Sequence, residues 1–139
     1  MARLTRADLK KQQAQRRTKV IDVPEWGGDV EIAAMTGTAR DSYEADLINS
    51  RVARGAKEQR LNLQNIRARL VARCMINADG SYTYDYTNPG DIDELGSMDS
   101  AGLDRVFKEC QVLNGITDED VDALTKNSRA EANGVSGSN

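Results

Sequence analysis

Residues 23–32 read V-P-E-W-G-G-D-V-E-I and contain the only tryptophan of the chain. Apolar and polar residues alternate on both sides of the glycine pair, and this pattern indicates two short strands joined by a tight turn. If the two glycines occupy the central turn positions, Trp26 pairs with Asp29. The same register pairs Val23 with Ile32.

This alternation gives the predicted hairpin an apolar face and a polar face, because successive side chains of a strand point to opposite sides. The apolar face carries Ile21, Val23, Val30, Ile32 and Ala34, with Glu25 near its end. The polar face carries Asp22, Pro24, Trp26, Asp29 and Glu31. This register places Trp26 on an acidic, solvent-exposed surface.

Two interpretations of Trp26 remain open. Tryptophan is enriched at interaction hot spots, so an exposed Trp26 at the hairpin tip suits binding of a partner protein. In the other interpretation Trp26 folds down over a helix, because a four-residue loop would change the register and the direction of the side chain. The predicted partner-binding residues are Pro24, Glu25, Trp26, Gly27 and Gly28 at the tip, with Arg16 and Arg17 as a secondary contact.

The composition predicts a single, mainly helical domain. The chain has 139 residues, of which 39% are hydrophobic and only 4% are aromatic. A core must then be built from Leu, Ile, Val, Ala and Met, which favours helices over a β-sandwich. The predicted fold class is α+β and mainly α, with an N-terminal β-hairpin packed on a compact bundle of about four to five helices.

Capping signals and apolar periodicity divide the chain into an arm, a domain and a tail. The hairpin is predicted at 20–34 and the helices at about 38–54, 57–76, 91–95, 100–114 and 118–127. Caps are predicted at Thr5 with Asp8, Thr38 with Asp41, Asn88 with Pro89, and Thr117 with Asp120. Residues 20–127 form the predicted domain, 1–19 a basic arm with a helix at about 6–17, and 128–139 a disordered tail.

The helix at 57–76 is predicted to lie at the centre of the core. Its apolar stripe is Leu63, Ile66, Leu70 and Cys74, flanked by Arg60, Arg67, Arg69 and Arg73. Flanking arginines usually lay their stems along the edge of the core and pair with carboxylates. The alternating tyrosines Tyr82, Tyr84 and Tyr86 either pack on a neighbouring helix or lie against a partner strand or nucleic-acid bases.

Charge is unevenly distributed along the chain. Residues 1–19 carry seven Lys or Arg and a single acidic residue, Asp8, so the arm holds +6 and the rest of the chain holds −9. A basic arm is able to meet nucleic acid or an acidic protein surface. A solvated helix is the simpler interpretation, and the pI of about 5.0 disfavours nucleic acid as a partner.

The residue types exclude most catalytic sites. The chain has no His, which rules out Ser-His and Cys-His nucleophilic pairs, and it has no P-loop or dinucleotide-binding glycine spacing. Cys74 and Cys110 lack metal-site spacing and indicate buried packing in a reducing compartment. We therefore predict no catalytic residue, no metal and no cofactor, and a soluble protein without a membrane-spanning segment.

Three strings of the sequence, in this order, resemble the tail assembly chaperones of tailed bacteriophages and prophages. They are V-P-E-W-G-G-D-V-E-I at 23–32, M-T-G-T-A-R-D-S-Y-E at 35–44, and L-N-G-I-T-D-E-D-V-D-A-L-T-K-N-S at 113–128. Met35 replaces the leucine that is usual in the family, and Tyr43 takes the aromatic position. The resemblance runs from about Leu4 to Ser128, and the combination of strings is what makes it specific.

The resemblance implies a function that the residues alone do not give. Proteins of this family bind the long tape-measure protein in the host bacterial cytoplasm, keep it soluble and recruit tail-tube subunits. They use no ATP, often form homo-oligomers, and leave before the virion is complete. This chain corresponds to the short form of the family, made without a frameshift, and no membrane or nucleic-acid partner is expected.

The same resemblance predicts a longer product. Family members are often made in two lengths by programmed −1 ribosomal slippage near the end of the shorter form, and the longer form recruits tube protein. Thr125-Lys126-Asn127 can be encoded ACA-AAA-AAC, which contains the slippery heptamer A-AAA-AAC. An AAG codon at Lys126 would rule out this placement, so the gene sequence tests it.

Two functions of other classes remain as alternatives. The first is a structural tail or connector subunit, which would be found in purified virions. The second is a small nucleic-acid-binding accessory protein that uses residues 3–19 and the arginines of the 57–76 helix, and its binding to DNA would depend steeply on salt. Neither accounts for the three strings together.

Overall fold

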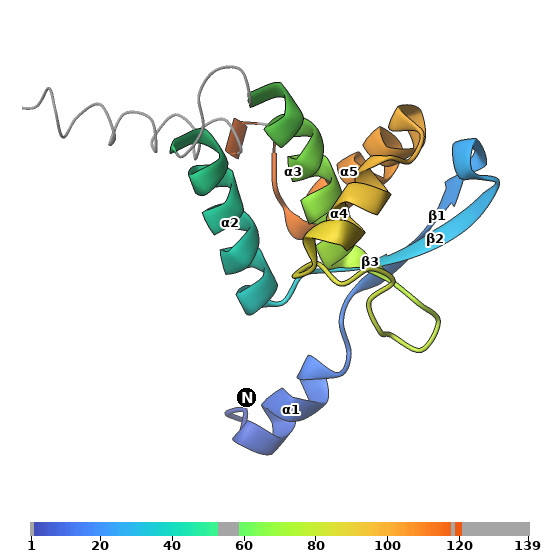
Figure 1. Ribbon diagram of the computed structural model, residues 1–139. Helices are drawn as coiled ribbons and strands as arrows, with labels where there is room; N and C mark the ends of the chain where they lie inside the picture. The colour runs from blue at the N-terminus through green and yellow to red at the C-terminus, as the bar shows by residue number, and fades with distance from the viewer. Residues whose placement is uncertain (1, 53–58, 118, 121–139) are drawn as a thin grey trace, which may run out of the picture.

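The computed structural model describes residues 2–52, 59–117 and 119–120 of the chain. Within these residues the fold is α+β and mainly helical, as predicted, with five α-helices and one three-stranded antiparallel sheet (Figure 1). The helices are α1 (Arg6–Gln13), α2 (Gly37–Val52), α3 (Gln59–Cys74), α4 (Pro89–Gly96) and α5 (Ser100–Asn114). The strands are β1 (Thr18–Val23), β2 (Gly28–Ala33) and β3 (Met75–Ile76), and a 3-10 turn, η1 (Pro24–Trp26), joins β1 to β2.

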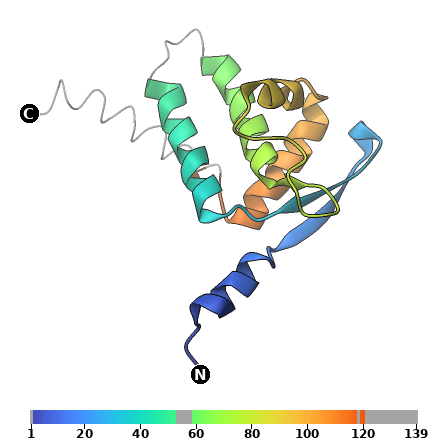
Figure 2. The same ribbon diagram turned by 60° about the horizontal axis from the view of Figure 1, so that its bottom comes forward.

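The elements form a helical body on the sheet and one helix that stands apart. Helix α3 contacts α2, α4, α5 and strand β2, so it lies at the centre of the body, as predicted. The β1–β2 hairpin extends past α5, while α1 projects away from the body in both views (Figures 1 and 2). The helices therefore cover one face of the sheet and leave α1 without a helical neighbour.

The register of the hairpin differs from the predicted one. Val23 lies opposite Gly28, and Asp22 lies opposite Asp29. Pro24 starts the 3-10 turn, and Gly27 ends it with φ +80° and an N–H donated to the Pro24 carbonyl at 3.1 Å. The loop therefore has four residues, because proline presets the turn and has no N–H for a strand ladder, and the second glycine is already part of β2.

The predicted faces of the two strands are nevertheless confirmed, because the register shift is even. Ile21, Val23 and Ile32 are buried against the helices, whereas Asp22 and Asp29 are exposed on the other face. An odd shift would have turned the apolar residues to solvent.

Strand β3 was not predicted from the sequence, because the preceding helix was expected to continue to Ile76. Helix α3 ends at Cys74, and Met75 and Ile76 pair with Ile32 and Glu31 of β2. A two-residue strand carries no periodic signal, so only its tertiary partner β2 defines it. The chain then turns at Asn77–Gly80 and returns to form a single bridge between Ile76 and Tyr82.

The predicted caps are confirmed with one exception. Thr5 and Asp8 form a full capping box, Asn88 accepts the Gly90 N–H at 2.9 Å, and Gly115 ends α5 with φ +65°. The exception is the cap at Thr38, which is wrong, since Thr36 Oγ1 accepts the Ala39 N–H at 3.1 Å and α2 begins at Gly37.

The ends of the chain were predicted less well than its centre. Helix α1 stops at Gln13 rather than at 17, and β1 begins at Thr18, because the Arg17 carbonyl already accepts the Ala34 N–H at 2.8 Å. Thr117 and Asp120 form the predicted capping box, with hydrogen bonds of 2.8 and 3.0 Å. The rest of the 118–127 helix, the 128–139 tail and Thr125-Lys126-Asn127 lie outside the described residues.

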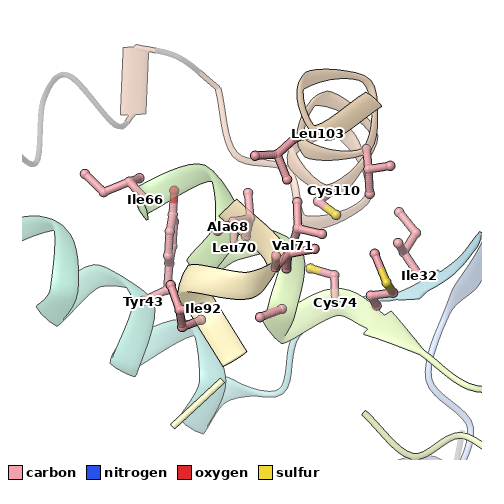
Figure 3. Packing of buried hydrophobic residues seen from close by; sticks show 14 of the residues in the cluster. Ile32, Tyr43, Ile66, Ala68, Leu70, Val71, Cys74, Ile92, Leu103 and Cys110 are labelled. Carbon is pink, nitrogen blue, oxygen red and sulfur yellow. The ribbon is translucent and has the colours of Figure 1, made fainter. Parts of the chain in front are cut away.

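The core gathers around α3 (Figure 3). Ile66, Leu70 and Cys74 are buried as predicted, whereas the side chain of Leu63 lies outside the described part. The buried surface of α3 is wider than the predicted stripe, because α4 and α5 also cover it. Its additional buried residues are Ala68, Val71, Ala72 and Arg73.

Candidate protein-binding surfaces

The hairpin tip is tied to α5 by one ion pair and one close apolar contact. The Arg105 guanidinium donates to both Glu25 carboxylate oxygens, at 3.0 and 2.8 Å. The indole of Trp26 lies directly against Gly102, where a β-carbon would come within 2.3 Å of Nε1 and 2.7 Å of Cδ1. A glycine inside α5 is therefore what allows the indole to pack.

This packing supports the second interpretation of Trp26. Trp26 is half-buried, and its indole N–H is buried without a hydrogen-bond partner among the described residues. The predicted exposed position on the acidic face is wrong, because the four-residue turn redirects the side chain toward α5. The sequence carried one unused signal, Gly102, because a glycine inside a helix costs about 1 kcal/mol relative to alanine.

The remaining tip residues stay accessible. Pro24, Glu25, Gly27 and Gly28 are exposed, and no heavy atom lies within 4 Å of the β-carbon position at Gly28. The tip thus exposes backbone and small side chains, and the packing of Trp26 on α5 holds it in place. Its role in partner binding stays a prediction.

The predicted secondary contact, Arg16 and Arg17, lies at the opposite end of β1 from the tip. Arg16 Nε donates to the Ala34 carbonyl at 2.9 Å, and its guanidinium lies 5.6 Å from the ring centre of Tyr82. Arg17 is exposed. Six strand residues, roughly 20 Å of β1, separate this end from the tip, so the predicted site residues form two surfaces rather than one.

A surface hollow of about 540 Å³ lies beside the basic contact. Arg16, Arg17 and the first residues of α2 line it, and no carboxylate is among its described lining residues. The positive end of the α2 dipole adds to the two cations. The lining of this hollow, next to the arm, therefore carries positive charge.

The exposed part of the arm is α1 and the residues before it, because Arg16 and Lys19 hold the end of the arm to the body. Helix α1 has no buried residue, and the exposed fractions of Leu4 and Leu9 are 66% and 54%. Hydrogen bonds from Thr5 lower the pKa of Asp8, whose carboxylate is held in the capping box. Within the described part of the chain the other charged side chains of the arm, Arg3, Arg6, Lys10, Lys11 and Arg17, form no ion pair.

Three of the four flanking arginines of α3, Arg67, Arg69 and Arg73, pair with carboxylates, as predicted, and the side chain of Arg60 lies outside the described residues. Arg73 is only 2% exposed, and its Nη2 donates to Asp46 at 2.9 Å and to Ser42 at 2.7 Å. Arg67 lies 4.0 Å from Asp104. Complete burial of Arg73 was not foreseen, because helical spacing alone gave no sign that α2 and α4 would enclose it.

One tyrosine of the alternating row accounts for part of this burial. Tyr86 packs its ring against the Arg73 guanidinium, 4.7 Å from the ring centre, so the helix-packing interpretation holds for this residue. Tyr82 meets Tyr86 edge-on, with ring centres 5.3 Å apart. Tyr84 is half-buried and packs against the core, so all three tyrosines of the row make contacts within the molecule.

The two thiols lie together in the core. Cys74 and Cys110 are free and buried, and Figure 3 shows them on facing helices α3 and α5. A hydrogen bond from the Cys110 thiol lowers the pKa of Cys74, and burial raises the pKa of Cys110. Both act as small core residues, as the sequence indicated.

The described residues contain no group of three or more His, Cys, Asp or Glu arranged to hold a metal ion. A search of the same residues for a helix long and apolar enough to cross a membrane found none.

Comparison with solved structures identifies the fold. The structure of the bacteriophage HK97 tail assembly chaperone matches this chain with a TM-score of 0.54 and 18% sequence identity. The match covers 76% of this chain and 96% of the HK97 protein. This chain has the fold of a bacteriophage tail assembly chaperone. No family model and no curated protein matches the sequence. The likeness to the HK97 protein therefore rests on the comparison of structures.

Proposed function

We propose that this chain is a phage tail assembly chaperone that binds the tape-measure protein, keeps it soluble and helps recruit tail-tube subunits. The observation that carries the proposal is the fold shared with nearly the whole HK97 tail assembly chaperone. The three sequence strings, found independently of the fold, support the same function. The proposed role needs no catalytic residue and no cofactor, and it belongs to the host bacterial cytoplasm.

The accessible surfaces suit a client that must be released again. Among the described residues, the exposed large hydrophobic side chains come from different elements, namely Leu4, Leu9, Val20, Ile48, Met98 and Val112. Small, polar contacts exchange readily, whereas large dry interfaces characterise permanent complexes. Many copies lining one long client would hold it through the sum of weak contacts, and tube subunits would then displace them.

We assign the client contact to the hairpin tip, with Arg16 and Arg17 as the secondary contact. Pro24, Glu25, Gly27 and Gly28 surround a Trp26 that is fixed on α5, so the tip is held rigid before binding. A pre-formed contact loses little conformational entropy when it binds. The longer, frameshifted form starting near Thr125 is part of the same proposal.

Co-expression with the tape-measure protein encoded downstream tests the function. The account expects the tape-measure protein to become soluble and to co-purify with this chain, but not with an unrelated acidic protein of similar size. A tape-measure protein that stays insoluble beside abundant folded chain would contradict it.

A variant of the tip then tests the assigned contact. Gly28→Gln adds a side chain in open space at an ordinary φ, so the domain should keep its stability while client co-purification falls. Ala78→Gln, at an exposed position in the turn after β3 and away from the tip, is the matched control. Equal client recovery with both variants would remove the tip from the proposal.

A further inference from the structure

The outer edge of strand β1 is open. The strand order of the sheet is β1-β2-β3, so β1 pairs with β2 on one side and with no strand of the described residues on the other (Figure 1). The opposite edge of the sheet is partly covered, because β3 pairs with β2 and the chain returns along β3 at Tyr82. Strand β1 therefore has six residues along an edge to which another strand can be added.

The backbone of β1 directs hydrogen-bonding groups toward this open side. The Ala34 N–H donates to the Arg17 carbonyl at 2.8 Å, and in an antiparallel ladder such bonds recur at every second residue. From Lys19 onward, alternate residues of β1 therefore bond to β2, and the residues between them direct their N–H and C=O groups outward. These outward groups belong to Thr18, Val20 and Asp22, and none of them has a hydrogen-bond partner among the described residues.

Strand β1 lacks the usual protection of an open edge. Soluble proteins protect such edges with a proline, a bulge, a lysine or a covering element, because an open strand pairs readily with another chain. Strand β1 contains no proline, and its register with β2 runs without a bulge. Its lysine, Lys19, is held on the helix side, where Nζ contacts Glu109 at 2.7 Å. With Val20 60% exposed, the edge is accessible to another extended chain.

The open edge runs between the two surfaces assigned to the client. Arg16 and Arg17 lie just before its start, and Pro24 of the hairpin tip follows its end. A six-residue extended segment spans roughly 20 Å, the same length as β1. One extended segment laid along β1 would therefore reach both surfaces at once.

We propose that the outer edge of β1 binds an extended segment of the client protein as an added strand. The proposal rests on the function proposed above and adds the conformation in which the client is held. Backbone groups of the segment would pair with those of Thr18, Val20 and Asp22. Pairing through the backbone accepts many sequences, so it suits repeated sites along one long client.

The side chains beside the edge define the segment further. Val20 lies between the other two outward residues, and β-branched side chains pair well with apolar ones across neighbouring strands. The hollow at Arg16 and Arg17 has no carboxylate among its described lining residues. The preferred segment therefore carries an apolar residue beside Val20 and an acidic residue at the Arg17 end. A helical client segment does not fit this edge, because its backbone groups are already bonded within the helix.

Amide hydrogen exchange of the full-length chain tests the pairing. Short overlapping peptides that cover the tape-measure protein encoded downstream are screened for binding, and the peptides that bind serve as probes. In the free chain we expect the amides of Thr18, Val20 and Asp22 to exchange quickly and those of Lys19 and Ile21 slowly. A bound peptide should slow exchange at the first three amides about tenfold or more. Unchanged exchange at these amides, or a screen in which no peptide binds, would overturn the proposal.

N-methylation of a binding peptide shows whether it binds as a strand. Each backbone N–H of the peptide is replaced in turn by an N-methyl group, which removes one hydrogen-bond donor and leaves the side chains unchanged. A strand turns alternate N–H groups toward its neighbour, so affinity should fall at every second residue. Losses without this alternation would count against an added strand and overturn the proposal.

Proline at the edge tests the same contact from the protein side. Val20→Pro removes one outward N–H and keeps the bonds between β1 and β2, so an edge strand tolerates it. Peptide affinity should fall about tenfold or more, while urea unfolding shows a folded domain. Ala78→Pro is the matched control, because it lies in the turn that the Gly80 N–H closes on the Asn77 carbonyl at 2.9 Å, where proline is favoured. Parent-like binding by folded Val20→Pro would overturn the proposal, and the N-methyl series decides if this variant does not fold.

Failure of this contact can be told from failure of the proposed function. A tape-measure protein that becomes soluble while the Thr18, Val20 and Asp22 amides still exchange quickly would refute the β1 contact and leave the function standing. A tape-measure protein that stays insoluble would refute the function itself. Protection of the three amides that grows with the concentration of the free chain would place a second copy on the edge and overturn the proposal.

Discussion

Trp26 and Gly102 illustrate how one small residue positions a large one. Glycine inside a helix costs about 1 kcal/mol relative to alanine, and no turn or positive φ requires it at Gly102. The space left by its missing side chain is filled by the Trp26 indole. The glycine therefore makes room for the indole, and the packing of the hairpin tip depends on it.

Substitution of this glycine is predicted to destabilise the fold. Gly102→Ala should lower the free energy of unfolding by about 1–3 kcal/mol, despite the better helix propensity of alanine, because its β-carbon would overlap the indole. Urea unfolding followed by circular dichroism measures this change. Gly28→Ala, with open space and an ordinary φ, should have little effect.

A double variant separates steric overlap from a general loss of helix stability. Trp26→Ala should itself destabilise the domain, since it removes the packing on α5. Combined with Gly102→Ala, it should cost less than the sum of the two single changes, because the overlap has gone. Strict additivity, or a Gly102→Ala protein as stable as the parent, would contradict the assigned contact.

The hairpin and α5 behave as one unit at the scale of elements. Trp26 contacts Gly102, Glu25 pairs with Arg105, and Lys19 of β1 pairs with Glu109 at 2.7 Å. The three contacts run along α5 from its first turn toward its end. The hairpin is thereby held beside the helical body along the length of β1, although it extends past α5.

The ion pair at the tip predicts a pH dependence. A hydrogen bond from Arg105 lowers the pKa of Glu25 below its ordinary value. The folded state then holds this proton less readily than the unfolded state, so the pair stabilises the fold above the ordinary pKa of glutamate. This stabilisation is lost as the pH falls through the lowered pKa.

Unfolding free energies of the parent and of Glu25→Gln, measured from neutral to acidic pH, check this dependence. The difference between the two proteins should be largest near neutral pH and should vanish in acid. Arg105→Gln removes the same interaction from the α5 side and should show the same trend. A difference that stayed constant or grew in acid would disprove the assigned pair.

Elements with strong local signals were predictable from the sequence. Helices α4 and α5 carry an Asn88-Pro89 start and an Asn114-Gly115 stop, and both boundaries are close to the predicted ones. The apolar face of the hairpin followed from alternation alone. Local chemistry decides these features, so no tertiary information was needed.

Other features depend on tertiary neighbours and were therefore missed. β3 exists only because β2 pairs with it, and the burial of Arg73 depends on Ser42, Asp46 and Tyr86 from other segments. The hairpin register was predicted wrongly because the glycine pair indicated a two-residue turn, whereas Pro24 starts a 3-10 turn. For the candidate site, the sequence did not show that the tip is separated from Arg16 and Arg17 by the length of β1.

The whole molecule combines a firmly packed body with charged surfaces whose side chains form no ion pair within the described residues. Helix α1 buries none of its residues, and the outer sheet face carries Asp22, Asp29 and Glu31, which form no ion pair within the described residues. Separate basic and acidic surfaces favour contacts with other molecules. Such contacts form quickly and are sensitive to salt. This organisation suits a chaperone whose copies gather on a client and later leave it.

The amount of this chain in assembly intermediates and in finished particles tests the account most directly. Both fractions are purified from cells that produce the phage or prophage encoding it, and the chain is quantified by mass spectrometry against the tape-measure protein. We predict many copies per tape-measure protein in the intermediates and none in the particles. A fixed number of copies retained in every finished particle would contradict it and identify the chain as a structural subunit of the tail.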